Sequence, residues 1–152
     1  MLENTMFKKI SDKLRSTISK GPVKPLEQDL PYFKLGGKEG VQKLVGRFYH
    51  HMDTNPSAKS CRDLHGKSLE SAAMKLEMFL SGWLGGPSLY IEKYGHPRMR
   101  KRHFPFAIGE RQRDEWLLCM RDAMNDMNLD AEFDHYLWQA FRRFAEHMRN
   151  QG

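Results

Sequence analysis

Apolar residues recur along this chain at the spacing of one helical face, and this pattern limits the fold more than any other feature. The clearest segment is the last: Phe133, Tyr136, Leu137, Ala140, Phe141, Phe144, Ala145 and Met148. Similar faces span residues 41–52, 69–83 and 116–127, and the third is apolar almost all round. No stretch alternates apolar and polar residues for long enough to make a strand, and no fixed repeat is present. The pattern predicts an all-α domain.

One domain and a short appendage account for the 152 residues. Residues 29–152 form the domain, whose 39% hydrophobic and 11% aromatic content is enough to bury a core. Residues 1–28 form an N-terminal extension with apolar residues four positions apart and a break at Gly21-Pro22. This spacing predicts a basic amphipathic helix for a membrane surface or a partner, and a frayed basic tail is the alternative.

Charge and cysteine content narrow the class of protein. The 25 basic and 19 acidic side chains give a net charge of +6, which suits phosphate, an anionic membrane or an anionic ligand, or simply favours solubility. No run approaches the roughly 18 apolar residues of a membrane span, and no secretory signal is evident. Cys61 and Cys119 lie in no CxxC pattern. We expect a soluble cytoplasmic protein with no integral membrane segment and no structural disulfide.

Residues 85–109 interrupt the helical pattern with several glycines and prolines. A poorly periodic stretch of this length inside a compact domain is typical of a functional loop. His96 and His103 lie in it, but with Pro97 between them and no HExxH-like arrangement they make a poor zinc site. No serine lies in a GxSxG turn, and Cys119 is expected in a buried helix that disfavours a thiolate. A zinc enzyme and a hydrolase are therefore disfavoured.

The same stretch supplies parts of a site for a flat apolar cofactor. A cofactor held by one axial histidine needs an imidazole, large apolar side chains, and hydrogen-bond donors opposite the imidazole. His103 is followed by Phe-Pro-Phe, and the helical faces add Tyr49, Phe79 and Trp116. The basic series at residues 98–102 would neutralise carboxylates at the edge of the cofactor, or would form a solvated loop.

Several segments carry a family resemblance. They are Leu35-Gly36-Gly37, Phe48-Tyr49, FLSGWLGGP at 79–87, YGHPRMR at 94–100, RHFPFAIG at 102–109 and RDEWLLCM at 113–120. In these segments the chain resembles group II truncated haemoglobins, over about residues 29–149. The resemblance implies a two-over-two globin fold, in which four main helices surround a b-type haem and the helix before the proximal histidine is shortened into an extended loop.

The resemblance also implies roles around the haem iron. By position, His103 matches the proximal iron ligand, Tyr49 the distal tyrosine and Trp116 the distal tryptophan of this group. His65 matches the start of the distal region, although the preceding linker varies in length among relatives, so that a neighbouring residue could take its place. Tyr49 and Trp116 could instead be core residues whose polar atoms bond to the backbone.

Other residues are matched to the haem itself. Ala72 stands where conventional globins keep a distal histidine, so it leaves a path to the iron, and Leu76 is expected in the pocket wall. Phe141 and Phe144 are expected in the core. Lys75, Tyr90 and the arginines are candidates to hold the propionates. The expected haem contacts are Ala72, Lys75, Leu76, Phe79, Tyr90, His96, Arg98, Arg102, His103, Phe106 and Trp116.

The function that the resemblance implies is reversible binding of O2, NO or CO at a His-ligated haem iron. Strong distal donors favour redox chemistry over delivery, so NO dioxygenase or peroxidase-like activity on peroxide is expected, with a reductase as partner. We expect a monomer or weak dimer. The alternative is a haem-free basic helical module for nucleic acid or a membrane surface. Acids such as Glu110 interrupt its basic residues, so we expect no nucleic-acid partner.

Overall fold

The computed structural model describes residues 27–152, and every regular element in this part of the chain is helical. The elements are η1 (Glu27–Asp29), α2 (Pro31–Leu35), α3 (Gly37–Thr54), η2 (Pro56–Ala58), α4 (Lys59–Arg62), α5 (Glu70–Trp83), α6 (Leu89–Tyr94), α7 (Met99–Arg102), α8 (Glu110–Asn125) and α9 (Ala131–His147). The predicted all-α class is confirmed. The helix expected within residues 1–28 lies almost wholly outside the described residues.

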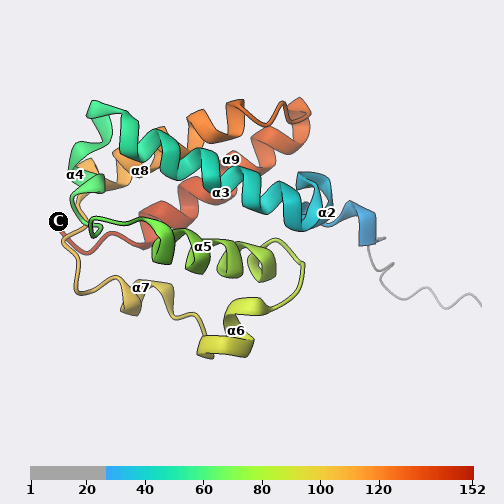
Figure 1. Ribbon diagram of the computed structural model, residues 1–152, viewed down its shortest axis with the longest axis horizontal. Coiled ribbons are helices and arrows are strands. Elements are labelled where there is room, and N and C mark those ends of the chain that lie inside the picture. The colour runs from blue at the N-terminus through green and yellow to red at the C-terminus, as the bar shows by residue number, and fades with distance from the viewer. Residues whose placement is uncertain (1–26) are drawn as a thin grey trace, which may run out of the picture.

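The four long helices form two antiparallel pairs, α3 with α5 and α8 with α9 (Figure 1). Helix α3 packs on both α5 and α8, so it joins the two pairs. All four helices occupy segments with the predicted helical period. Helix α8 begins at Glu110, six residues before the apolar repeat starts at Trp116. Its first turns are polar, so periodicity alone could not show them.

Local chemistry sets where the long helices begin and end. Gly36 has φ 112°, a left-handed conformation that ends α2 and lets the chain turn into α3. Helix α3 stops before Asn55, whose side-chain oxygen accepts from the Ser57 backbone N–H at 2.9 Å. Asp130 caps α9 by accepting from the backbone N–H groups of Glu132 and Phe133. These caps fix the register in which each apolar face meets the others.

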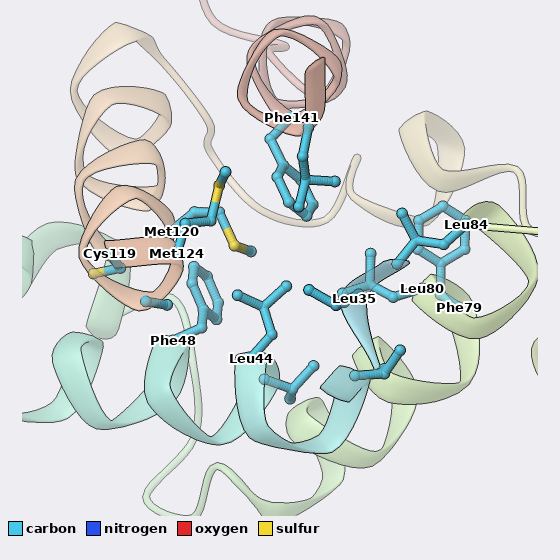
Figure 2. Close-up of a cluster of buried hydrophobic side chains, with 14 of the residues drawn as sticks. Leu35, Leu44, Phe48, Phe79, Leu80, Leu84, Cys119, Met120, Met124 and Phe141 are labelled. Atoms are coloured by element: carbon cyan, nitrogen blue, oxygen red, sulfur yellow. The ribbon is translucent and has the colours of Figure 1, made fainter. Parts of the chain in front are cut away.

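The core lies between the two helix pairs and consists almost wholly of apolar side chains. Phe48, Leu44 and Met52 of α3 are essentially inaccessible to solvent, as are Met120 of α8 and Phe141 of α9. Figure 2 shows Leu44, Phe48, Met120 and Phe141 converging from three helices, with no nitrogen or oxygen atom in the labelled side chains. Burying an aliphatic or aromatic side chain of this size contributes about 1.5–3 kcal/mol, so the cluster is a main source of stability. The core borders the candidate site, because Cys61, Phe79 and Tyr90 belong to both.

The end of α5 turns sharply so that the segment after it can return along the bundle. A Cβ atom on Gly86 would lie 2.5 Å from the Tyr32 ring, so only glycine fits there. The Tyr32 backbone N–H donates to the Leu84 carbonyl at 2.9 Å, which ties α2 to this turn. Residues 85–109, expected to be irregular, contain the short helices α6 and α7 (Figure 1). Helices of four to six residues are too short to show a period in the sequence.

Candidate functional site

A cavity of about 700 Å³ lies between α5, α7 and the ends of α3, α8 and α9. Its size is in the range of small-molecule and cofactor sites. Nearly all the expected haem contacts line it, together with the three expected distal residues: Tyr49, His65, Ala72, Lys75, Leu76, Phe79, Tyr90, Arg102, His103, Phe106 and Trp116. Side chains far apart in the sequence therefore meet in one place.

His103 closes α7 and contributes the imidazole on one wall of the cavity. Helix α7 begins directly after Arg98, whose φ of 40° is rare for a residue with a side chain and turns the chain into this single helical turn. The Nδ1 atom of His103 lies 2.5 Å from the Met99 carbonyl oxygen one turn earlier. A carbonyl can only accept, so Nδ1 carries the hydrogen. The lone pair of Nε2 is then free, which is the arrangement of a metal-ligating histidine.

Tyr49, His65 and Trp116 come from three different segments. The rings of Tyr49 and His65 meet edge to face with centroids 5.9 Å apart. Trp116 packs 5.1 Å from Phe48, so the core of the bundle holds the indole in place. His65 Nδ1 lies 3.0 Å from the Cys61 carbonyl, which fixes the imidazole by the same reasoning as for His103. These residues bring a hydroxyl, an indole N–H and an imidazole to one cavity.

Burial favours the neutral forms of three side chains in the cavity, those of Tyr49, His65 and Cys61. It raises the pKa of the Tyr49 hydroxyl far above its usual value, and the nearby Cys61 raises it further. Burial lowers the pKa of His65, and the charges of Arg62 and His103 lower it again, although the bond to the Cys61 carbonyl opposes this. Burial also raises the pKa of the Cys61 thiol to about 12, so a thiolate is disfavoured. At neutral pH the phenol is protonated and the thiol is inert.

Arg102 lies at the mouth of the cavity and is already held by the backbone. Its Nε donates to the Pro97 carbonyl at 2.6 Å, and one terminal nitrogen donates to the Tyr94 carbonyl at 3.2 Å. Its guanidinium lies over the ring of Tyr90, 5.3 Å from the centroid. The cavity lining does not include His96 or Arg98; instead, the Arg98 backbone N–H donates to His96 Nδ1. Contact of these two residues with a cofactor stays a prediction.

Sequence reasoning missed part of the lining. Phe144, expected in the core, lines the cavity, and Ala145 and Met148 of the same helical face join it. Periodicity marks a face as apolar but cannot say whether helices or a ligand cover it. Leu64 and Gly66, the two neighbours of His65 that the variable linker left open as alternatives, also line the cavity. Other lining residues gave no recognisable signal: Cys61, Ser68, Ser71, Met99, Ile108, Gln112 and Arg113.

The residues present fit a haem group. The cavity combines apolar walls with one imidazole whose Nε2 is free to coordinate, and cationic side chains stand at its edge. Among residues 27–152, no group of three or more His, Cys, Asp or Glu side chains is placed to hold a metal ion. A single histidine would be enough for an iron whose remaining protein-independent ligands are supplied by a porphyrin. A helical bundle around such a cavity is the architecture of a small haem globin.

Comparisons with known proteins agree with this architecture. The model of the family described as bacterial-like globin matches residues 31–150. The chain is 39% identical over 121 residues to Group 2 truncated hemoglobin YjbI of Bacillus subtilis, covering 80% of this chain and 89% of that protein. It is similar to the group II 2-on-2 hemoglobin of Agrobacterium tumefaciens, with a TM-score of 0.80 and 43% identity over 85% of this chain and all of the other.

A second solved structure gives the same result. The cold-adapted truncated hemoglobin of Pseudoalteromonas haloplanktis matches with a TM-score of 0.79 and 41% identity, over 81% of this chain and 99% of that one. The chain therefore belongs to the bacterial-like globins, and within them to the group II truncated haemoglobins. The family predicted from the sequence is confirmed.

Family membership carries the coarse function. A globin has a haem cofactor and binds O2 and other diatomic gases through it. The alternative, a haem-free module for nucleic acid or a membrane surface, is not favoured by these comparisons. Within the described part of the chain, no helix has the length and apolar character needed to cross a bilayer.

Proposed function

We propose that this protein holds haem b through His103 and binds O2, NO and CO reversibly, with redox chemistry as its main role. The observation that carries the proposal is the anchored imidazole of His103 in the same cavity as Tyr49, His65 and Trp116. When bound, haem supplies an iron that coordinates these gases and exchanges electrons. The cavity and its side chains decide which gases stay and how fast they leave.

His103 would provide the proximal bond through Nε2. Its Nδ1–H donates to the Met99 carbonyl, which fixes the ring plane and makes the imidazole a better ligand. Phe106, whose ring centroid lies 6.4 Å from that of His103, and the buried Ile108 add apolar surface to this side of the cavity. Lys75 and Arg102 at the cavity edge would pair with the two haem carboxylates, each pair contributing little alone because both side chains are exposed.

The bound gas would receive hydrogen bonds from Trp116, Tyr49 and His65. The indole Nε1–H can only donate, and the raised pKa of Tyr49 keeps its hydroxyl available as a donor. A hydrogen bond to a group that carries charge contributes about 1.5–3 kcal/mol. Each 1.4 kcal/mol is a factor of ten, so one such bond slows O2 release by roughly ten- to a hundredfold. Two donors favour retention of O2, which suits NO oxidation or peroxide reduction better than delivery.

The redox role requires a partner. Oxidation of NO by O2 to nitrate consumes one electron in addition to those of the two gases, so a reductase would have to return one electron in each cycle. We propose such a reductase as a partner, together with a cytoplasmic location and a monomeric or weakly dimeric state. Sedimentation of the haem-loaded protein and fractionation of cells test the last two proposals directly.

Replacing His103 by Gly tests the proposal. The wild type should give a Soret band after haem addition and a five- or six-coordinate ferrous spectrum, whereas His103→Gly should lose the proximal bond and regain it with added imidazole. His135→Ala is the control, because the imidazole of His135 is exposed on α9 and lies outside the cavity lining. A His103→Gly protein with the wild-type ferrous spectrum and haem affinity would contradict the assignment.

A further inference from the structure

The chain beyond α9 returns to the segment that carries His103. Helix α9 ends at His147, and Asn150 then lies beside residues 103–108. Its backbone N–H donates to the Ile108 carbonyl at 2.9 Å, and that of Gln151 donates to the same oxygen at 3.1 Å. The last residues of the chain are therefore bonded to the connection between α7 and α8.

The side chain of Asn150 is fully used at this position. Its Nδ2 donates to the carbonyl of His103 at 3.2 Å and to the carbonyl of Phe106 at 2.8 Å. Its Oδ1 accepts from the backbone N–H of Ile108 at 3.0 Å. The partners settle the orientation of the amide, because two of them can only accept and one can only donate. Among side chains of this length, only an amide satisfies all three groups.

Apart from local bonds, such as the one from the Phe106 backbone N–H to the His103 carbonyl at 3.0 Å and those of the Arg102 side chain to Pro97 and Tyr94, little else holds this segment. Residues 104–107 are all exposed, with Phe104 at 55% and Phe106 at 43%, and the first buried side chain is Ile108. Helix α7 has four residues, and a helix of one turn has no independent stability. Hydrophobic burial therefore contributes little to the placement of His103. Polar bonds from outside the segment must supply it.

We propose that Asn150 is a positioning residue for the axial imidazole. The His103 ring is anchored at Nδ1 by Met99, and its main chain is anchored at the carbonyl by Asn150. The bond to Met99 restricts rotation of the His103 ring, and the bond from Asn150 restricts the position of the His103 backbone. Together they set the length and tilt available to a bond from Nε2. This proposal rests on the proposed ligation of haem by His103.

Two variants at Asn150 separate the parts of this clamp. Asn150→Asp keeps an acceptor for Ile108 but turns the donor toward His103 and Phe106 into a second acceptor. Asn150→Ala removes all four side-chain bonds, including the one that Asn150 Oδ1 accepts from Gln151 Nε2, and leaves the backbone bonds. Gln151→Ala is the matched control, because the side chain of Gln151 bonds only to Asn150 Oδ1. The readouts are the iron–histidine stretching band of the ferrous protein in resonance Raman spectra and the rate of haem loss to an acceptor apoglobin.

Both Asn150 variants should shift or broaden the iron–histidine band and speed haem loss by about three- to tenfold, as expected for the loss of one or two hydrogen bonds. Gln151→Ala should leave both readouts near wild type. A shift in Asn150→Ala without one in Asn150→Asp would overturn the role of Nδ2. An unchanged band in both variants would overturn the proposal as a whole. Absence of the band from the wild type would instead refute ligation by His103, so the two failures are distinct.

A measurement on the wild type covers the case in which neither variant folds. In the diamagnetic CO complex, the two Nδ2 protons of Asn150 should exchange with solvent at least about tenfold more slowly than those of a free asparagine, because both are bonded. Protons that exchange at the free rate would show that the clamp is not formed in solution and would overturn the proposal.

Discussion

At the scale of single residues, Trp116 gives the sharpest test of the cavity. Its ring packs 5.1 Å from Phe48 and 5.9 Å from Phe144, and only its indole N–H is polar. Trp116→Phe keeps an aromatic ring and removes the donor. We predict O2 dissociation about ten- to a hundredfold faster and CO dissociation changed much less, because bound CO carries less charge to receive a hydrogen bond. Stopped-flow dissociation kinetics measure both rates.

The same measurement shows which distal residue donates the principal hydrogen bond to O2. Should O2 leave Trp116→Phe at the wild-type rate, the principal donor would be Tyr49 or His65. Tyr49→Phe is the matched comparison, because it removes one hydroxyl and leaves the ring that meets His65 at 5.9 Å. The thermal unfolding of each variant without haem shows whether a change in rate comes from the lost donor or from altered packing.

At the scale of elements, a buried carboxylate joins α4 to α8 and so supports the distal wall. Glu115 is 7% exposed, and its Oε1 accepts from the Ser60 backbone N–H at 3.0 Å while Oε2 accepts from the Ser60 hydroxyl. Ser60 precedes Cys61, whose carbonyl holds the His65 ring. The four residues of α4 could not form a stable turn alone. Glu115 therefore places His65 indirectly, through α4.

We predict that Glu115→Ala lowers the free energy of unfolding by about 1–3 kcal/mol, because it leaves the half-buried donors of Ser60 without this acceptor. The change should also alter the ligand kinetics that depend on His65. Asp114→Ala is the control: Asp114 lies one position away and pairs with Arg113 on the surface, where such a pair contributes little. Urea unfolding monitored by circular dichroism compares them, and equal effects of both substitutions would contradict a role for burial.

The long helices could be predicted from the sequence, whereas the short ones could not. The long helices were predictable because each repeats one apolar face along a stretch of twelve or more residues, as α9 does from Phe133 to Met148. The short helices α4, α6 and α7 were not, because bonds from distant residues hold them, such as Glu115 to Ser60. In the site, His103 and Trp116 stood out by their neighbours in sequence. Asn150 did not, since nothing in the sequence connects it to residues 103–108.

At the scale of the whole molecule, the protein combines a packed apolar core with a cavity that its own side chains do not fill. The side chains of Phe48 and Phe141 are inaccessible to solvent in an apolar core, whereas α5, α7 and the ends of α3, α8 and α9 surround a cavity of about 700 Å³. A ligand that binds only the folded chain adds stability by mass action, about 4 kcal/mol when its free concentration is a thousand times its Kd. Haem should therefore stabilise the protein as a whole and the cavity end most of all.

Removing haem tests this division directly. We predict that the apoprotein keeps most of its helix content but unfolds at a clearly lower temperature than the haem-loaded protein. Hydrogen exchange should accelerate most in residues 85–109 and 148–151, which the cavity end and the Asn150 bonds hold, and least in α3 and α8, which share the dry core. Exchange that accelerates equally in all four long helices would mean that haem organises the entire bundle, and that the core around Phe48 is not independently stable.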